Sequence, residues 1–166
     1  TSFGLGGPAD LYVEPPHRES LRDALCLLEA EGVPTLVLGR GTNLLVRDGG
    51  LDGVVVATAK ALADVDVADR AIVAGGGAPL QRVIRRAAEA GLSGLEPLSG
   101  IPGSVGGAVV MNAGSFGAAI GDLVERVEVF SEGAPAILEA GAVGFTYRGS
   151  AIPEGAVVER VRLRLA

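Results

Sequence analysis

Residues Gly39–Val46 (GRGTNLLV) place two glycines and two polar side chains directly after a short apolar stretch, Thr35–Leu38. Glycines in such a loop let consecutive backbone N–H groups converge on one point, which forms a nest for an anion such as a phosphate. Thr42 and Asn43 add side-chain donors at the same place. The segment therefore indicates a phosphate-binding loop, although an ordinary turn between two strands explains these residues equally well.

Two familiar nucleotide-binding motifs do not match this chain. A Walker A loop requires Gly-Lys-Ser/Thr, and the only lysine of the sequence is Lys60. A dinucleotide-binding fingerprint requires a third glycine and a following helix, whereas Gly39 and Gly41 lack that glycine and residues 44–46 suggest a strand. Residues 4–9 (GLGGPA) fit the spacing of the fingerprint, but no strand precedes them, so we treat that match as chance.

A second glycine-rich segment, Ser99–Gly117 (SGIPGSVGGAVVMNAGSFG), is apolar and rich in small residues. Its glycines leave little side-chain cover, so a flat ligand could lie close to the backbone. Residues 104–111 are predicted to form a short helix whose N-terminus adds donors for an anion. A tightly packed core turn is the alternative interpretation, but it does not readily explain two such clusters in one domain.

Residues Phe145–Ser150 (FTYRGS) set Arg148 beside Tyr147 in a turn ahead of the last apolar stretch. Arginine stays charged and grips a carboxylate or a phosphate with a planar fork. Spacing alone does not separate Arg148 from an ordinary surface arginine. The lone His17 is interpreted as a solvated residue at a helix start, and residues 64–69 are interpreted as an acidic loop without a partner histidine.

The composition of the 166 residues excludes several classes of function. A formal net charge of −6 argues against nucleic acid or an anionic membrane surface as the main partner. A single cysteine and a single histidine exclude a disulfide framework and His-paired metal centres, so we predict no metal site. No apolar run reaches the ~18 residues that a membrane span needs. These observations leave a soluble protein of a reducing compartment, which we expect to be cytoplasmic. We also expect a monomer.

Hydrophobic spacing predicts the elements that must position these loops. Helices are predicted over 17–31 and 79–91, where Gly32 and Gly91 stand at the expected helix ends. Short strands are predicted over 11–13, 35–38, 54–57, 71–74, 124–130 and 157–165. The last two of these alternate as half-buried antiparallel strands do. This order of elements predicts an α+β or mixed α/β fold.

In this order and spacing, GRGTNLLV, GLSGLEPLSGIPGSVGGAVVMNAGSFG and FTYRGS closely resemble the UDP-N-acetylenolpyruvoylglucosamine reductase family of bacterial peptidoglycan synthesis. The opening TSFGLGGPADLYVEP is similar to that family's usual start, so the resemblance covers residues 1–166. It implies an α+β fold of the para-cresol methylhydroxylase/vanillyl-alcohol oxidase type. In that fold two small α+β subdomains with mixed and antiparallel sheets hold FAD between them, and we place them approximately at 1–58 and 59–166.

The resemblance also implies roles for individual residues. The family's GxG[ST]N loop wraps the FAD pyrophosphate, and its Gly-Ile-Pro-Gly block lines the flavin. The cofactor-binding residues carried over to this sequence are Gly39, Gly41, Thr42, Asn43, Leu44, Gly100, Ile101, Pro102, Gly103, Ser104, Gly106, Gly107, Asn112 and Gly114. The family's Tyr-Arg pair implies that Tyr147 and Arg148 bind the substrate. Arg148 is the catalytic residue by this resemblance, because it holds and polarises the enolpyruvyl carboxylate.

By the same resemblance, the activity is the reduction of UDP-N-acetylglucosamine enolpyruvate to UDP-N-acetylmuramate. NADPH is the reductant and non-covalently bound FAD is the cofactor, so the partners are NADPH and the UDP-sugar. Both ends of the sequence look cut, and the family's C-terminal substrate-binding domain, which supplies the proton donor, is expected to be absent, so we expect this chain alone to be inactive. A FAD-dependent oxidase of the same superfamily and a non-catalytic nucleotide-binding module are the alternatives.

Overall fold

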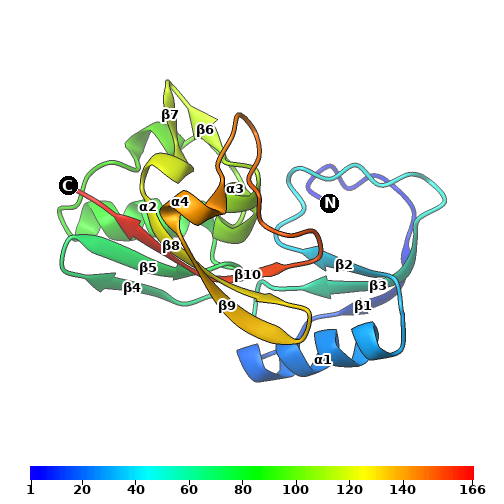
Figure 1. Ribbon diagram of the computed structural model, residues 1–166. Coiled ribbons are helices and arrows are strands. Elements are labelled where there is room, and N and C mark those ends of the chain that lie inside the picture. Colours follow the sequence, from blue (N-terminus) through cyan, green and yellow to red (C-terminus); the bar gives the residue numbers. More distant parts are fainter.

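A computed structural model describes residues 1–166, which form two lobes side by side (Figure 1). The N-terminal lobe contains a three-stranded sheet and α1, and the C-terminal lobe contains a five-stranded sheet and the other helices. The elements in chain order are β1 (Ala9–Val13), α1 (Arg18–Ala30), β2 (Thr35–Leu38), β3 (Leu51–Ala57), β4 (Val65–Ala68), β5 (Ala71–Gly75), α2 (Leu80–Glu89), η1 (Glu96–Leu98), α3 (Val105–Val110), β6 (Gly114–Ser115), β7 (Ala118–Ala119), η2 (Ile120–Asp122), β8 (Val124–Ser131), β9 (Ala134–Glu139), α4 (Ala140–Val143) and β10 (Val157–Arg164).

The sheet of the N-terminal lobe has the order β1-β3-β2, and both outer strands run parallel to β3. Helix α1 lies along one face of this sheet, below it in Figure 1. Leu21 of α1 is fully buried against Val54 and Val56 of β3, because leucines at helical spacing share one face of the helix. The helix ends before Gly32, which takes a left-handed φ of +63°. The predicted helix over 17–31 is confirmed.

The sheet of the C-terminal lobe is antiparallel, with the order β4-β5-β10-β8-β9. Its central strand, β10, is the last in the sequence. Helices α2 and α3 supply Val83 and Val109 to a core that they share with Ile72 and Val161 of the sheet. The predicted α+β class is confirmed, because the structure combines a parallel sheet, an antiparallel sheet and packed helices.

Strand β10 contributes to the cores of both lobes because it contains a bulge. Its register with β8 shifts next to Glu159, which is the extra residue on this strand. Regular alternation, carried back from Val161, would turn Val157 toward the core of the C-terminal lobe. Instead Val158 packs in that core, and Val157 packs with Leu21 in the core of the N-terminal lobe. The predicted regular alternation of this strand is therefore wrong at its start.

Three other local predictions differ from the structure. Residues 44–46 form no strand, and the chain stays irregular until β3 begins at Leu51, so Leu45 is exposed to solvent. The acidic residues 64–69 are not a loop throughout, because Val65–Ala68 pair with β5 as an edge strand. Strand β9 was not predicted from the sequence. None of the helices has both the length and the apolar character that crossing a membrane requires.

Candidate functional site

The two glycine-rich loops meet where the lobes join. Gly39 directly follows β2 in the N-terminal lobe, and a Cβ at this position would overlap the Oγ atom of Ser104 and lie 3.3 Å from its Cβ. The Thr42 hydroxyl donates a hydrogen bond of 3.3 Å to the carbonyl oxygen of Pro102, 60 residues away. A Cβ at Gly103 would lie 3.1 Å from Thr42 Oγ1. At Gly39 and Gly103, the absence of a side chain leaves room for the Ser104 and Thr42 side chains of the opposite loop.

The loop after β2 is held by the first residues of the chain. Gly41 is buried with a left-handed φ of +62°, and its carbonyl oxygen accepts a hydrogen bond of 3.0 Å from the Ser2 N–H. A side chain at Gly41 would be strained because non-glycine residues rarely adopt this φ. Asn43 is exposed and Leu44 is half-buried, so this loop offers a polar side chain and free backbone to solvent.

The second loop is fixed to the turn that follows β5. The carbonyl oxygen of Gly103 accepts the Leu80 N–H at 3.0 Å, and the Gly106 N–H donates to the Gly76 carbonyl oxygen at 2.8 Å. A Cβ at Gly106 would lie 3.0 Å from that same oxygen, so close packing inside the protein explains this glycine. Gly107 and Gly100 differ, because both are exposed, and a Cβ at Gly100 would meet no atom within 4 Å.

Ser104 connects this loop to α3. Its side-chain oxygen accepts a hydrogen bond of 3.4 Å from the Gly107 N–H, which caps the first turn of the helix. The residue is only 3% exposed. Ile101 packs partly buried against the core of the C-terminal lobe, and Pro102 is exposed. The predicted short helix over 104–111 is confirmed as α3.

Asn112 joins the end of α3 to the turn that contains the Tyr-Arg pair. Its Nδ2 group donates a hydrogen bond of 2.9 Å to the carbonyl oxygen of Thr146, and its Oδ1 atom accepts one of 3.0 Å from the Gly121 N–H. The Ser150 hydroxyl adds a bond of 3.0 Å to the carbonyl oxygen of Val110. The amide of Asn112 is therefore used inside the protein, and it positions the turn that follows β9 and α4.

Arg148 is one of the two central residues of that turn. The turn stands beside α3 in Figure 1. The turn is closed by two backbone hydrogen bonds between Thr146 and Gly149, and Arg148 has a left-handed φ of +60°. The neighbouring Tyr147 is 92% exposed, and the Arg148 Cζ atom lies 5.7 Å from the centre of its ring. Arg148 takes part in none of the salt bridges of the molecule. Its guanidinium is free to bind an anion.

Gly114, another predicted residue, has a structural explanation of its own. Gly114 begins the hairpin of β6 and β7, where a Cβ would lie 2.8 Å from the carbonyl oxygen of Ala118. The hairpin itself lies next to η1, close to the second loop in the chain. The structure thus brings Gly39 and Thr42 of the first loop against Pro102, Gly103 and Ser104 of the second, and it attaches the Tyr-Arg turn to the end of α3. The binding roles of these residues remain predictions.

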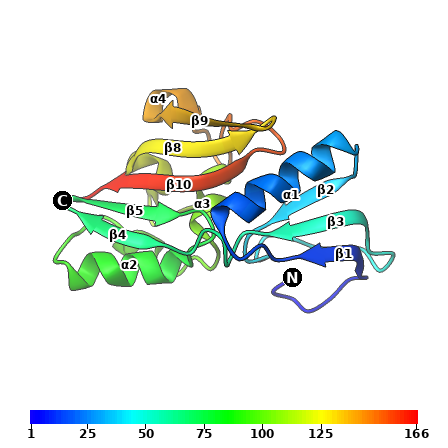
Figure 2. The same cartoon turned by 90° about the horizontal axis from the view of Figure 1, so that it is seen from below.

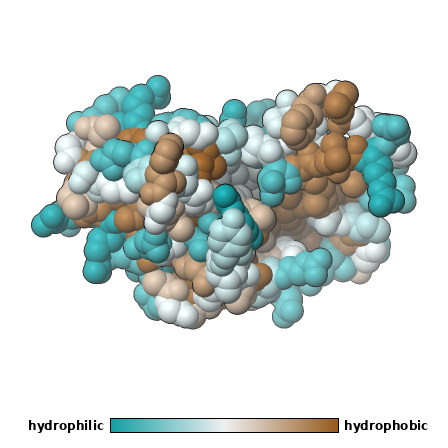
Figure 3. Space-filling model, turned by 90° about the horizontal axis from the view of Figure 1, so that it is seen from above, coloured by the Kyte–Doolittle hydropathy of each residue, from teal (hydrophilic) through white to brown (hydrophobic).

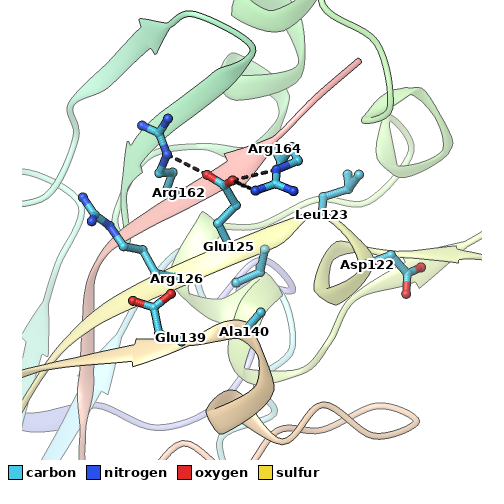
Figure 4. Close-up of a pocket in the computed structure, with 9 residues that line it drawn as sticks. Asp122, Leu123, Glu125, Arg126, Glu139, Ala140, Arg162 and Arg164 are labelled. Carbon is cyan, nitrogen blue, oxygen red and sulfur yellow. Dashed lines mark hydrogen bonds and ion pairs between the residues drawn. The ribbon is translucent and has the colours of Figure 1, made fainter.

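A charged depression lies elsewhere, over the strands β8, β9 and β10 (Figure 4). In it the Glu125 carboxylate accepts hydrogen bonds from Arg164 Nε at 2.7 Å and Arg162 Nε at 2.6 Å. These bonds, with that from Arg164 the larger cause, hold the pKa of the Glu125 carboxyl below its usual value. No predicted site residue lines this depression, so we assign it a structural role in linking β8 to β10.

The glycines 75–77 form a junction that the sequence did not assign to any role. A Cβ at Gly76 would overlap the carbonyl oxygen of Val158, and a Cβ at Gly77 would overlap that of Thr58. Three chain segments therefore meet here with their backbones in contact. Three consecutive glycines directly after a strand were the only signal in the sequence that could have indicated this junction.

Seen from above, the surface is hollowed between the two lobes in Figure 3, and apolar side chains gather beside the recess. Large apolar side chains on the loops of the N-terminal lobe, Phe3, Leu5 and Leu45, are exposed. A recess with apolar walls and a few polar donors is the usual form of a cofactor site. The glycine-rich loops thus lie where a large, flat ligand with phosphates could contact both lobes.

Residues 9–134 match the sequence family described as "FAD binding domain", and the chain belongs to this family. The particular proteins that it resembles are UDP-N-acetylenolpyruvoylglucosamine reductases. That of Acidiphilium cryptum is 47% identical over 164 residues, which are 98% of this chain and 53% of the relative. That of Anoxybacillus flavithermus is 41% identical over 153 residues, 92% of this chain and 51% of the relative. The chain therefore spans about half the length of these relatives.

Solved structures agree with this assignment. The UDP-N-acetylenolpyruvylglucosamine reductase from Thermus caldophilus is similar over 100% of this chain and 59% of its own, with a TM-score of 0.84 and 43% identity. The cholesterol oxidase from Brevibacterium sterolicum is similar over 93% of this chain and 34% of its own, with a TM-score of 0.73 and 17% identity. The second likeness shows the fold alone. The predicted family resemblance and the predicted FAD-binding fold are confirmed.

Proposed function

We propose that this chain is the FAD-binding part of an enzyme that reduces UDP-N-acetylglucosamine enolpyruvate to UDP-N-acetylmuramate. One observation carries the proposal: two glycine-rich loops from different lobes approach so closely that a side chain at Gly39 would overlap Ser104. A site built from the backbones of two lobes suits a long dinucleotide with a flat ring system. The similarity to the reductases over 98% of the chain supports the choice of reaction.

The residues of the junction fit FAD in chemical terms. In this proposal Gly39, Gly41, Thr42, Asn43 and Leu44 hold the pyrophosphate, because glycine-rich turns present backbone N–H groups to anions. The flavin lies along the second loop, where the backbones of Gly100 and Gly107 are exposed and no bulky side chain intervenes. When bound, FAD supplies the hydride chemistry, and the protein supplies position and charge.

Arg148 acts on the substrate rather than on the cofactor in this proposal. Its guanidinium forms no salt bridge and stands at the exposed tip of a turn, so it is available to hold the enolpyruvyl carboxylate by a bidentate fork. Negative charge that develops next to this carboxylate is stabilised by the fixed positive charge. Tyr147 stands beside Arg148 and adds apolar contact for the substrate. Asn112 keeps the turn in place through Thr146.

Other partners and the location follow from the same assignment. NADPH is the reductant, the UDP-sugar is the substrate, and neither nucleic acid nor a membrane is a partner. The enzyme is a cytoplasmic monomer in this proposal. A flavin oxidase would use an organic substrate and oxygen instead. Rapid mixing of the complete enzyme, of which this chain is the proposed FAD-binding part, with NADPH distinguishes the two reactions by the absorbance of the flavin. Flavin bleaching by NADPH supports the reductase, and bleaching only by an alcohol or phenol contradicts it.

Titration of the purified chain with FAD tests the cofactor site. We expect quenching of flavin fluorescence and release of all yellow colour on acid precipitation, because no covalent bond holds the cofactor. Gly100→Ala should weaken FAD binding without changing the melting temperature of the FAD-free protein, since the new methyl group meets no protein atom. Gly49→Ala is the matched control, because it too has open space and lies outside the predicted contacts. A Gly100→Ala variant with unchanged FAD affinity would contradict the proposed flavin contact.

A further inference from the structure

A buried carboxylate joins the two lobes where α1 passes beside β10 (Figure 2). Glu159 is the extra residue of the β10 bulge, and bulges redirect the side chain that they contain. Its side chain is 2% exposed and points to α1 of the other lobe, where it meets Arg22. A buried carboxylate is unfavourable without a partner, so this contact requires the bulge and the arginine together.

The geometry of this ion pair is directional. Arg22 Nε donates to Glu159 Oε1 at 2.7 Å, and Arg22 Nη2 donates to Glu159 Oε2 at 2.5 Å. The guanidinium also lies over the ring of Phe130 in β8, with its Cζ atom 5.3 Å from the ring centre. Apolar contacts between the lobes, such as those of Val157, have no preferred direction. The bidentate fork does have one, so it constrains the angle at which α1 meets the larger sheet.

A short chain of backbone hydrogen bonds connects the pair to the candidate site. The Glu159 carbonyl oxygen accepts the Gly76 N–H at 3.0 Å, and the Gly76 carbonyl oxygen accepts the Gly106 N–H at 2.8 Å. Gly106 is two residues from Ser104, which faces Gly39 of the other lobe. This series of contacts thus begins at Glu159, which binds Arg22 of α1, and ends at Ser104, which faces Gly39 at the lobe junction.

We propose that Arg22 and Glu159 are a positioning pair that sets the spacing of the two glycine-rich loops and thereby the affinity for FAD. Neither residue belongs to the predicted cofactor contacts. The inference rests on the proposed function, because it needs FAD to lie between the loops. Loss of the fork loosens the angle between the lobes, so FAD must then restore that angle when it binds, and its affinity falls.

Two conservative variants test the pair in the 166-residue chain. Arg22→Lys keeps the positive charge but removes the fork, and Glu159→Gln keeps the volume but removes the charge. We expect each to raise the FAD dissociation constant by about tenfold or more, by the cost of lost preorganisation. Glu125→Gln is the matched control, since it breaks the ion pairs of Glu125 with Arg162 and Arg164, which lie within one sheet of one lobe. It should change FAD affinity less than twofold.

A distance measurement separates positioning from general destabilisation. Spin labels at Glu29→Cys in α1 and Ala90→Cys after α2, in a Cys26→Ser background, report the distance between the lobes without FAD. Arg22→Lys and Glu159→Gln should broaden the distance distribution, and Glu125→Gln should leave it narrow. If both variants keep the original FAD affinity and a narrow distribution, the inference is overturned. If the unsubstituted chain takes up no FAD, the proposed function fails, while the distance distributions still decide whether the pair positions the lobes.

Discussion

A glycine can leave room for its own protein or for a ligand, and individual residues of this chain show the difference. Gly106 leaves room for the protein, because a Cβ would meet the Gly76 carbonyl oxygen at 3.0 Å and its N–H is already bonded. Gly100 has open surroundings, as Gly49 does, so its role as a flavin contact stays a prediction. Gly106 and Gly100 belong to one motif, and the structure shows which of them the packing of the protein itself requires.

Gly39→Ala should damage stability and FAD binding together. The added methyl group overlaps Ser104 Oγ, so the serine must rotate out of its cap or the loops must separate. We expect a loss of about 1–3 kcal/mol of unfolding free energy, which is the usual cost of an overpacked contact. Urea unfolding and FAD titration measure the two effects. If this variant unfolds and binds FAD like Gly49→Ala, the close approach of the loops does not matter.

Substitution of Arg148 should affect turnover and leave the FAD site intact. In the complete enzyme of the proposed function, Arg148→Ala should slow turnover on the order of 10²- to 10³-fold, as the loss of one preorganised donor does. Arg148→Lys should also slow it, because lysine lacks the planar fork. Melting temperature and FAD content should stay constant, since Arg148 is exposed and forms no salt bridge. Arg70→Ala, another exposed arginine, is the control. A parallel loss of FAD and stability would make Arg148 a structural residue.

At the scale of elements, periodicity and end signals predicted what depends on local sequence. Helix α1 follows leucines at helical spacing and stops where Gly32 allows a left-handed φ. Strand β9 was missed because its sequence, APAILE, has a proline and few residues of high strand propensity. Its place at the edge of the sheet tolerates Pro135, since one side of an edge strand needs no partner.

The candidate site was only partly predictable for a related reason. Each glycine-rich loop could be identified from its own residues, but their contact depends on how two lobes pack. The bulge at Glu159 left only a weak signal, because regular alternation of VVERVRLRL would put this one charged residue on the apolar face with Val161 and Leu163. Arg22 likewise looked like one charged residue among many on a helix. Features set by packing between distant segments are absent from any local pattern.

The ion pairs between β8 and β10 should make stability depend on pH in acid. The pKa of Glu125 is lowered in the folded protein, chiefly by Arg164 and then by Arg162. The contribution of Glu125 to the free energy of unfolding is therefore fully present above the pKa of the unfolded chain, ~4.3. It is lost as the pH falls through the lower pKa of the folded protein. Glu125→Gln should be less stable than the original chain at pH 7 and equal to it at strongly acid pH. Urea midpoints across this range provide the test, with Glu89→Gln of α2 as the control. A difference that persists unchanged in acid would contradict this account.

At the scale of the whole molecule, the two lobes are bound to each other by more than their surfaces. Strand β10 supplies Val157 to one core and Val158 to the other. Chain segments also cross the junction at Gly76 and Gly77 with their backbones in contact. The predicted division at residue 58 remains a prediction, but the cores show that the first lobe is completed by residues from the far end of the sequence.

Heating should therefore unfold both lobes in a single transition. Calorimetry should give equal calorimetric and van't Hoff enthalpies, which is the signature of one cooperative unit. Val157→Ala and Val158→Ala should each lower the midpoint temperature of that one transition. Each leaves a cavity in a core, which should reduce the free energy of unfolding by about 2 kcal/mol. FAD should raise the midpoint temperature, because a ligand that binds only the folded form stabilises that form. Two separate transitions, each shifted by only one of the substitutions, would contradict a shared strand.

The position of β10 has a consequence for synthesis of the protein in the cell. The central strand of the larger sheet comes last in the sequence of these residues, and it also completes the smaller core. While a ribosome is still making residues 1–150 of this chain, β5 and β8 have no strand between them, and Leu21 lacks Val157, one of the valines of its core. The nascent chain must hold two incomplete cores until residue 164 has left the exit tunnel, and both can then close around the same strand.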